Sequence, residues 1–560
     1  MSVRSDSAGP CDAGYAPSTW ARHYHEHARE ILLEPHPMFE MIERAKQRYG
    51  QQRFIEFFDE HLSYAQGYEL AELLASALGH LGIGKGDRVG YCIPNHPVLF
   101  IALFACWRIG AVPAALNPAY PRERLQHQMR SVDVKLVISV DDAVILEKLG
   151  SPVAATSMPV IVCPLRSIDP GHGCAPLPAL SGLELHPWAR VLRAGAAVRS
   201  VSIDPSDLAA LAFTGGTTGG DPKAVCLTHA NLSMNSQQMR CWFPHLKDGQ
   251  EGLLAAAAFT HVSGLGPINN FGVRMAAALM VQQRFDPEQT LDWIDAGKLT
   301  VLCVVPTMLT ALLNAAERRS IDWSALKSVQ SGAAPLTGEV RERFRRLTGL
   351  EVVSLYGMTE TSPATLYGTQ DRGGDALSTG VPLPDTRVEI RTLQAPERCA
   401  PVGTVGEICV AGPQVMSGYW GRPDLNTQCF VGKFFRTGDL GYMSAEGLFY
   451  VVDRLKDVII AGGYNIYPSL LEDAIARHPA IADVAVVGVP DAYRGETAVA
   501  CVVLKTSASL TLNDLREFLR DKLSPMEAPT ALHVLPALPK TAAGKVSKAE
   551  VRSALMTPRA

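Results

Sequence analysis

Along most of the chain, apolar residues alternate between helical spacing and short continuous runs. In residues 68–83 (YELAELLASALGHLGI), leucines and alanines recur at intervals of three and four, which predicts an amphipathic helix. Residues 98–116 (VLFIALFACWRIGAVPAAL) predict a buried helix followed by a strand. Further short apolar runs predict buried strands at 135–140, 159–163, 208–213 and 300–305. Because helical patterns lie between several of these strands, we expect an α/β fold with mostly parallel sheets covered by helices.

The pattern changes from about residue 378. The stretches TGVPLPDTRVEI, VGTVGEICVAG and GLFYVVD alternate apolar and polar residues between Gly and Pro turns, which predicts a small β subdomain. After about residue 455 the chain mixes short strands and helices in a compact α+β pattern. We therefore place the main domain boundary near DRLKD, residues 453–457. The polar, Gly/Ser/Pro-rich residues 1–20 predict a disordered tail.

Composition narrows the function classes. The chain has 560 residues and a formal net charge of −4, so it lacks the basic excess that nucleic-acid binding requires. Its twelve cysteines are scattered without a C-x-x-C pair, which argues against a zinc site or a disulfide framework. The N-terminus has no apolar run typical of a secretion signal, and Arg108 and Pro113 interrupt the most apolar stretch. We therefore expect a cytoplasmic protein without a membrane segment.

Residues 211–229 (LAFTGGTTGGDPKAVCLTH) raise the first chemical hypothesis. They place a Gly- and Thr-rich turn after a predicted strand and before a predicted helix, where backbone N–H groups and hydroxyls can hold a phosphate. A Walker A loop would need lysine where Asp221 stands, so that motif is absent. Taken alone, the stretch could also be a flexible surface loop.

Four later stretches carry matching chemistry. SLYGMTE (354–360) offers an aromatic ring, hydroxyls and a carboxylate, and FRTGDLGY (435–442) places one acid on a Gly turn. VVDRLKDVIIAGGYN (451–465) crosses the predicted boundary, and LPKTAAGKVSK (538–548) is rich in lysine. Each stretch taken alone could have a purely structural role, but their order and spacing together indicate one functional site.

Together these motifs, with SGAAPL (331–336), resemble those of the adenylate-forming superfamily of acyl-CoA synthetases, luciferases and peptide adenylation domains. The resemblance extends over about residues 60 to 550. It implies that a carboxylate attacks the α-phosphate of Mg·ATP, giving acyl-adenylate and pyrophosphate. The thiol of coenzyme A then attacks the acyl-adenylate and releases AMP. The implied cofactor and co-substrates are Mg²⁺, ATP and coenzyme A.

The resemblance also implies roles for individual nucleotide-binding residues. Contacts with the phosphates fall on Thr214, Gly215, Gly216, Thr217, Thr218, Gly219, Lys223 and Thr359. Contacts with adenine and the adjoining backbone fall on Gly332, Ala333, Ala334, Tyr356, Gly357 and Met358. Asp439 and Arg454 would bind the ribose, and Glu360 with Thr217 would hold Mg²⁺.

Further roles concern the acid, the thiol and domain motion. Lys545 matches the family's mobile catalytic lysine, with Lys540 as the competing candidate, and His261 would gate the acid pocket. The expected walls of that pocket are Phe259, His261, Val262, Leu265, Ala333 and Leu355. Lys456 would be the pivot of a hinge at 454–457, between an N-terminal domain (21–453) and a mobile C-terminal domain (458–560). Gly462 and Gly463 would line the coenzyme A tunnel.

Some residues depart from the family pattern. The loop has Gly215 in place of a common serine and one extra residue at Gly220 or Asp221, while Leu355 replaces a glycine and should narrow the pocket. The apolar walls favour a fatty or aryl acid. Residues 117–129 (NPAYPRERLQHQM) resemble the fatty acid ligase branch of the superfamily, which implies a fatty acid of medium to long chain, with an aryl or alicyclic acid as an alternative. Transfer to a carrier-protein phosphopantetheine, a non-catalytic binder and a luciferase-like oxygenase are further alternatives. The protein could also form a homodimer.

Overall fold

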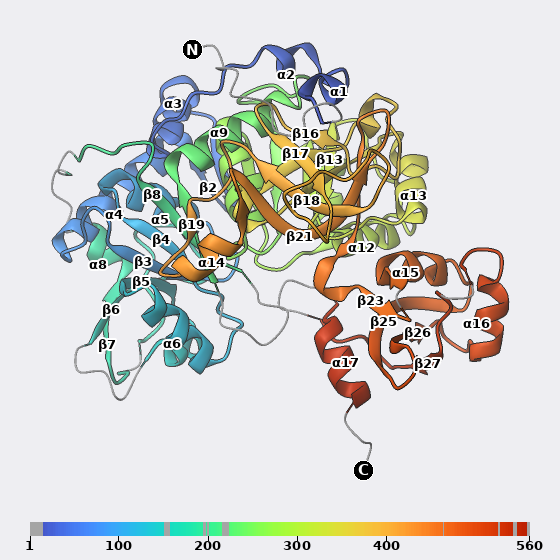
Figure 1. The fold of residues 1–560 in the computed structure, drawn as a ribbon. Coiled ribbons are helices and arrows are strands. Elements are labelled where there is room, and N and C mark those ends of the chain that lie inside the picture. Colours follow the sequence, from blue (N-terminus) through green and yellow to red (C-terminus); the bar gives the residue numbers. More distant parts are fainter. Residues whose placement is uncertain are drawn as a thin grey trace.

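The computed structural model describes residues 15–150, 157–177, 179–193, 198, 201–214, 223–462, 464–524, 527–540 and 546–556. Figure 1 shows the C-terminal elements, from β23 to α17, standing apart from the larger N-terminal part. The larger part contains two sheets with parallel centres and a small β subdomain. The predicted α/β fold with a smaller C-terminal α+β domain is confirmed.

The first large sheet has eight strands in the order β19-β9-β8-β4-β3-β5-β6-β7. The strands from β8 to β7 are mutually parallel, whereas β9 and β19 run antiparallel at one edge. Their bounds are β3 (Arg88–Cys92), β4 (Val112–Ala115), β5 (Val134–Val140), β6 (Met158–Cys163), β7 (Leu183–Pro187), β8 (Leu208–Thr214), β9 (Lys223–Thr228) and β19 (Gly418–Tyr419).

The second large sheet has nine strands in the order β16-β15-β14-β13-β12-β10-β11-β1-β2. Its centre, from β14 to β1, is parallel, and its two edges are antiparallel. The bounds are β1 (Arg53–Phe57), β2 (Glu60–Ser63), β10 (Gly252–Ala255), β11 (Ala278–Val281), β12 (Val301–Val304), β13 (Ser328–Gly332), β14 (Val352–Gly357), β15 (Ala364–Tyr367) and β16 (Val381–Pro382).

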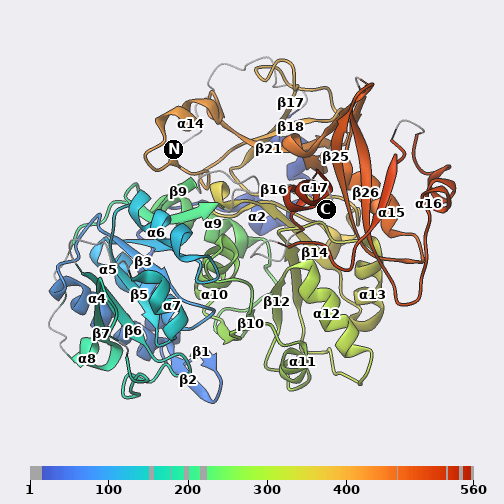
Figure 2. The ribbon, with the colours of Figure 1, turned by 90° about the horizontal axis from the view of Figure 1, so that it is seen from below.

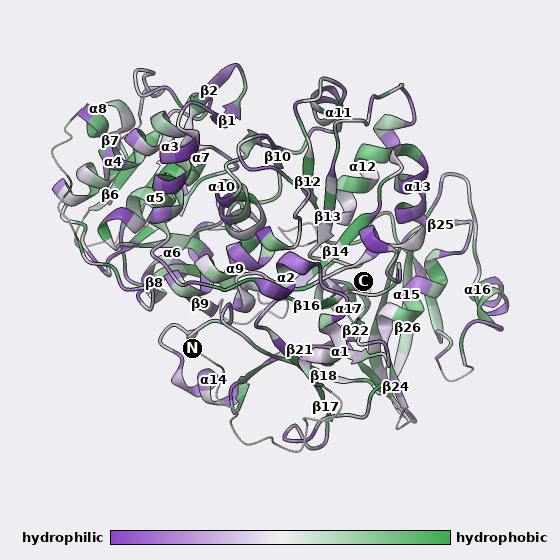
Figure 3. Cartoon of the chain, turned by 90° about the horizontal axis from the view of Figure 1, so that it is seen from above, coloured by the Kyte–Doolittle hydropathy of each residue, from purple (hydrophilic) through white to green (hydrophobic). Residues whose placement is uncertain are grey.

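Helices cover both sheets. One core joins α11, α12 and α13 to one face of the second sheet, and a larger core joins α3, α4, α5, α9 and α10 to the first sheet and the opposite face of the second. In Figure 3, hydrophobic colouring concentrates on central strands, and outward surfaces such as α13 are hydrophilic. The helices are α3 (Phe39–Tyr49), α4 (Tyr64–His80), α5 (Val98–Ile109), α6 (Arg122–Ser131), α7 (Ala143–Leu149), α8 (Trp188–Arg193), α9 (His229–Cys241), the π-helix η1 (Gly264–Asn270), α10 (Phe271–Arg274), α11 (Pro287–Asp295), α12 (Pro306–Ala316) and α13 (Gly338–Thr348).

Local sequence explains where two of these helices begin. The Ser63 hydroxyl accepts the Gln66 N–H while the Gln66 side chain accepts the Ser63 N–H, which forms a capping box at the start of α4. Thr228 and Asn231 form the same arrangement at the start of α9. The predicted buried helix in residues 98–116 is α5, and the strand after it is β4.

The β subdomain is antiparallel, with strands β17 (Arg387–Arg391), β18 (Gly406–Ala411), β20 (Phe430–Val431), β21 (Phe434–Met443) and β22 (Phe449–Arg454) beside α14 (Pro423–Gln428). The C-terminal sheet has α15 and α16 on one face and α17 on the other. Its elements are β23 (Ile459–Ala461), β24 (Tyr464–Ile466), α15 (Pro468–Ala476), β25 (Ile481–Asp491), β26 (Gly495–Leu504), α16 (Leu512–Leu519), β27 (Ala531–Val534) and α17 (Lys548–Met556). Helix α17 lies on the side that faces the larger part (Figure 2).

The structure corrects the predicted tail of residues 1–20 where it describes that tail. Pro17–Ala21 forms α1, which is followed by α2 (Glu26–Glu30). Trp20 is buried and packs edge-on against Phe449, with ring centroids 5.7 Å apart. A large aromatic ring that finds an apolar partner fixes this segment, so the tail prediction is wrong for residues 15–20. Residues 1–14 lie outside the described part of the chain.

Three further findings concern the sequence predictions. The Gly/Thr loop does not lead directly into a helix, because β9 follows it and pairs antiparallel with β8. Ten described cysteines carry free thiols, whereas Cys399 is disulfide-bonded. Among the described residues, no helix is long and apolar enough to span a membrane.

Candidate active site

A cavity of about 1210 Å³ lies where the carboxyl ends of several parallel strands meet the C-terminal part. Thr214 ends β8, Gly332 ends β13 and Gly357 ends β14, and all three line the cavity. Open α/β sheets commonly bind ligands at such strand ends. The opposite wall includes Lys540 and Ser547, so both parts of the chain enclose the same space.

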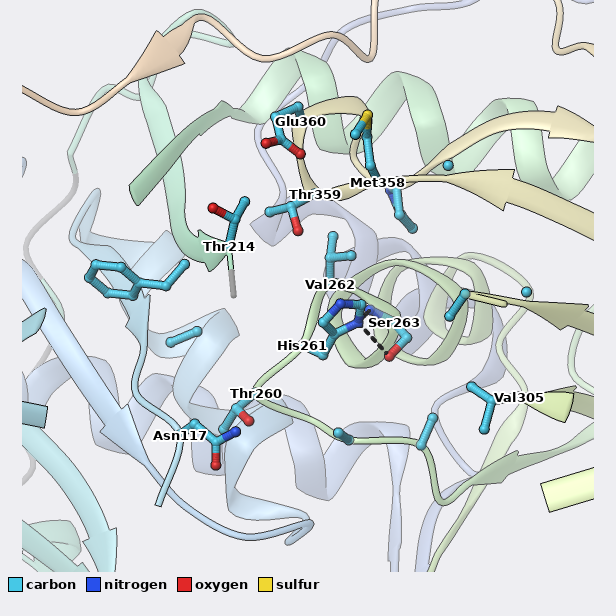
Figure 4. Close-up of a pocket in the computed structure, with 18 of the residues that line it drawn as sticks. Asn117, Thr214, Thr260, His261, Val262, Ser263, Val305, Met358, Thr359 and Glu360 are labelled. Carbon is cyan, nitrogen blue, oxygen red and sulfur yellow. Dashed lines mark hydrogen bonds between the residues drawn. The ribbon is translucent and has the colours of Figure 1, made fainter. Parts of the chain in front are cut away.

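Most of the described site residues predicted from the sequence line this cavity. Figure 4 shows Thr214, His261, Val262, Thr359 and Glu360 around one common space. The predicted residues that line it are Thr214, His261, Val262, Gly332, Ala333, Leu355, Gly357, Met358, Thr359, Glu360, Asp439, Arg454 and Lys456.

Other predicted residues stand back from the cavity or lie outside the described chain. Phe259 is buried against Phe100, with ring centroids 5.0 Å apart, and Leu265 is buried in η1, so neither forms the pocket wall that we predicted. The described residues Lys223, Ala334, Tyr356 and Gly462 are also absent from the lining. The predicted positions outside the described residues are Gly215, Gly216, Thr217, Thr218, Gly219, Gly463 and Lys545.

Glu360 supplies a buried carboxylate in the short 3-10 turn η2 (Thr359–Thr361) that follows β14. The Tyr419 hydroxyl donates to its Oε1 at 2.9 Å, and the Lys223 ammonium lies 4.9 Å from the Tyr419 ring centroid. Burial raises the pKa of Glu360 above its ordinary value. A nearby cation would offset that desolvation cost.

This environment fits a magnesium ion that accompanies ATP. Within the described residues, no group of three or more His, Cys, Asp or Glu side chains could hold a metal ion without help. Mg²⁺ in nucleotide sites usually takes one or two carboxylates, and water and phosphate oxygens complete its shell. Among the described residues predicted as metal ligands, Glu360 could supply one such carboxylate.

Asp439 is held at the edge of the cavity by two neighbours. The Tyr356 hydroxyl donates to Oδ2 at 2.8 Å, and Arg454 Nε lies 3.4 Å from Oδ1. Asp439 and Arg454 are cross-strand partners on β21 and β22, which fixes their separation. Burial raises the pKa of Tyr356 well above its ordinary value, so its hydroxyl stays protonated and keeps donating. The carboxylate is thus oriented to accept further hydrogen bonds from a ligand.

Two backbone features and one side-chain contact shape the part of the cavity where we expect the acid. Leu355 pairs with Gly332 across β14 and β13, and a Cβ atom on Gly332 would lie 3.2 Å from the Leu355 Cβ. The next residue, Ala333, has a φ of 69°, a backbone conformation that is strained for any residue other than glycine. His261 is oriented by Ser263, whose Oγ lies 3.1 Å from the His261 Nδ1.

Several residues that line the cavity were not among those predicted from the sequence. Asn117, Tyr120, Arg124, His127 and Gln128 enter from α6 and the loop before it, and Cys303 and Gln330 enter from β12 and β13. On the C-terminal side, Ala549, Glu550 and Ser553 add one face of α17. A weak signal was available on α6, because Arg124 and Gln128 are four residues apart and share a face.

Comparisons with known proteins agree with this architecture. The family model for the AMP-binding enzyme matches residues 42–420, and that for the AMP-binding enzyme C-terminal domain matches residues 470–545. A long-chain-fatty-acid–CoA ligase of Bacillus subtilis (strain 168) is 35% identical over 537 residues, covering 92% of this chain and 94% of the relative. A feruloyl-CoA synthase of Amycolatopsis sp. is 32% identical over 492 residues, covering 88% and 93%.

Solved structures agree as well. ATP-bound MatB from Rhodopseudomonas palustris has a TM-score of 0.79 at 26% identity, covering 92% of this chain and 98% of that one. The amide bond synthetase McbA from Marinactinospora thermotolerans has a TM-score of 0.79 at 25% identity, covering 93% and 100%. The chain therefore belongs to the AMP-binding enzyme family, the adenylate-forming superfamily that its motifs resemble.

Proposed function

We propose that this protein is an AMP-forming acyl-CoA synthetase. The observation that carries the proposal is the combination of a buried carboxylate (Glu360), an oriented edge carboxylate (Asp439) and apolar walls in one cavity. The 35% identity to a long-chain-fatty-acid–CoA ligase supports the same reaction. ATP, a carboxylic acid and coenzyme A are the substrates.

In the first half-reaction, an oxygen of the acid's carboxylate bonds to the α-phosphorus of ATP and pyrophosphate leaves. Thr214, Lys223 and the Gly/Thr loop between them would hold the departing phosphates, and Thr359 would hold the α-phosphate. Asp439 would accept hydrogen bonds from the ribose hydroxyls, beside Arg454. Mg²⁺ bound by Glu360 and Thr217 would offset the negative charge of the phosphates. Catalysis of this kind depends on positioning and charge stabilisation.

Lys545 would approach the acid and the α-phosphate in this step. It lies outside the described residues, but the residues on either side of its segment support the assignment. Lys540 and Val546 form an isolated antiparallel bridge, and both Lys540 and Ser547 line the cavity. The two described ends of this segment therefore lie beside the cavity that Thr359 and Asp439 also line.

In the second half-reaction, the thiol of coenzyme A attacks the acyl carbonyl and AMP leaves. We propose that the C-terminal domain rotates about Lys456 between the two steps and brings Gly462 and Gly463 to the thiol's path. Lys456 lies in the single 3-10 turn η4 (Leu455–Asp457), which connects β22 to β23. In β23–β24, Gly462 has a φ of 58°, which suits a tight exposed turn.

The acid is proposed to be fatty, of medium to long chain. Val262, Val305, Ala333, Leu355 and Met358 supply the apolar part of the cavity wall, where a hydrocarbon chain could pack. An aryl acid is the second candidate, because a feruloyl-CoA synthase is 32% identical over 88% of the chain. Leu355, beside Gly332, narrows one side and would favour a flat ring over a bulky one.

An acid screen tests the proposal. Purified protein, Mg·ATP and coenzyme A are incubated with acids from acetate to palmitate and with substituted benzoates and cinnamates, and thioester and pyrophosphate are measured. We expect equal amounts of both products from a subset of these acids. Pyrophosphate release without thioester, together with loading of a carrier-protein phosphopantetheine, would contradict coenzyme A as the acceptor.

A further inference from the structure

Alternate side chains of two neighbouring strands form the inner floor of the cavity. Cys303 of β12 and Gln330 of β13 are register partners and both line it, whereas Leu302 and Val329 belong to the core under α12 and α13. Two residues along a strand advance by about 6.6 Å. Gln330 therefore lies one pleat deeper than Gly332, away from the strand ends where the nucleotide site is proposed.

The carboxamide of Gln330 is held in one orientation. The Tyr367 hydroxyl donates to its Oε1 at 2.7 Å. Tyr367 is itself fully buried, stacked on Trp242 with ring centroids 5.9 Å apart and edge-on to Phe243 at 5.4 Å. Because these rings fix the tyrosine, they also fix the amide that it contacts.

The other end of this amide has no partner in the protein. Gln330 is 1% exposed, and its Nε2 finds no hydrogen-bond partner in the described part of the chain. Leaving a buried N–H unpaired costs about 1–3 kcal/mol. Its neighbour Cys303 does not compensate with charge, because burial raises the pKa of that thiol to about 12.

We infer that Gln330 determines substrate specificity by donating a hydrogen bond from Nε2 to an oxygen on the acyl part of the acid. The preferred acid then carries a hydroxyl, ether or carbonyl oxygen one pleat below Gly332. A plain hydrocarbon chain leaves Nε2 unpaired, and sites of this kind discriminate strongly against the analogue that lacks the polar group. This inference rests on the proposed function and narrows its substrate class.

The test compares matched acids. Fatty acids and benzoates are paired with their hydroxy and methoxy derivatives, with the oxygen moved carbon by carbon, and kcat/KM for acyl-CoA formation is measured for each. For the wild-type protein we expect at least one derivative to exceed its parent acid by about tenfold, which corresponds to about 1.4 kcal/mol.

Two variants show whether Gln330 causes the preference. Gln330→Met keeps the length of the side chain without its N–H groups, so the preference for the oxygenated acid over its parent should fall to about one. Tyr367→Phe keeps the Gln330 amide but removes the hydroxyl that holds its orientation. The preference for the oxygenated acid should therefore fall only partly. Thermal melting of each variant serves as the folding control, and Tyr367→Phe carries the test if Gln330→Met does not fold.

The outcomes are distinguishable. Turnover of many acids by the wild-type protein without preference for any oxygenated one would overturn the inference alone, as would an unchanged preference in Gln330→Met. Absence of thioester from every acid would overturn the proposed function and the inference together.

Discussion

At the residue scale, Asp439 is the side chain whose surroundings define its role most closely. Tyr356 and Arg454 orient its carboxylate, and charge-assisted hydrogen bonds contribute about 1.5–3 kcal/mol each. Asp439→Asn should therefore lower kcat/KM for ATP by about 10- to 100-fold. The measurement is pyrophosphate release at varied ATP with a saturating acid.

Asp424 provides a matched control for this change. It lies on the exposed helix α14, where it pairs with Arg422, so Asp424→Asn should leave the ATP dependence unchanged. If Asp439→Asn kept kcat/KM for ATP within about twofold of wild type, the ribose assignment would be wrong.

Glu360 gives a second prediction at this scale. Glu360→Gln keeps the shape of the side chain and its place beside Tyr419 but loses the charge that suits a magnesium ion. The Mg²⁺ concentration for half-maximal pyrophosphate release should rise by about tenfold or more. An unchanged Mg²⁺ dependence, in a variant whose melting temperature matches wild type, would remove Glu360 from the metal site.

How far the site could be predicted from sequence depends on how its residues are arranged along the chain. Thr359, Glu360 and Asp439 belong to short contiguous motifs, so their place in the site could be predicted from residue type and spacing. The role proposed for Gln330 could not be predicted from the local sequence. It depends on pairing with Cys303 on the neighbouring strand and on a hydrogen bond from Tyr367, which is distant in the sequence. Phe259 was placed in the wall by its motif, yet the backbone turns its ring toward Phe100.

At the element scale, the contact between α15 and α17 makes the free energy of unfolding depend on pH. Lys548 Nζ lies 2.9 Å from Glu472 Oε1, and both side chains are about one-fifth exposed. Burial outweighs this ion pair and raises the pKa of Glu472 to about 7 from its ordinary 4.5. Such a shift corresponds to about 3 kcal/mol.

The sign follows from proton binding. Between pH 4.5 and about 7 the folded protein holds a proton on Glu472 that the unfolded chain has released, so stability falls as the pH rises. Glu472→Gln should abolish that contribution, and the melting temperature of wild type relative to the variant should fall from pH 5 to pH 8. The exposed Glu517, which pairs with Arg520, gives the control Glu517→Gln. A pH-independent difference between wild type and Glu472→Gln would contradict the prediction.

Elements with strong periodicity were predictable, and short ones beside turns were not. Helices α4 and α5 and strands β5, β6 and β12 lie close to their predicted ranges, because each has its own apolar pattern. Strand β9 was missed, since its short run KAVCLT leads at once into the capped helix α9. Its strand character comes from pairing with β8, which the local sequence does not encode.

At the scale of the whole molecule, the account requires the C-terminal part to change position between the half-reactions. Lys456 lies in the 3-10 turn η4, and Lys456→Pro fixes φ near −65°, a value that 3-10 helices commonly adopt. Formation of acyl-adenylate should stay within about threefold of wild type, while transfer of supplied acyl-adenylate to coenzyme A should fall by about tenfold or more.

Lys456→Ala is the matched control, because it removes the same side chain and leaves the backbone free. It should retain both half-reactions. Equal loss of both half-reactions in the proline variant, or equal retention, would contradict a hinge at this residue.

The central claim is that the protein forms an acyl-adenylate in this cavity before the thiol of coenzyme A reacts. Acid-dependent exchange of radiolabelled pyrophosphate into ATP, measured without coenzyme A, tests this most directly. The account predicts exchange that requires both Mg²⁺ and an accepted acid, is unaffected by omitting coenzyme A, and is lost in Lys545→Ala. Absence of exchange with every acid that supports thioester formation, or release of ADP in place of AMP, would contradict it.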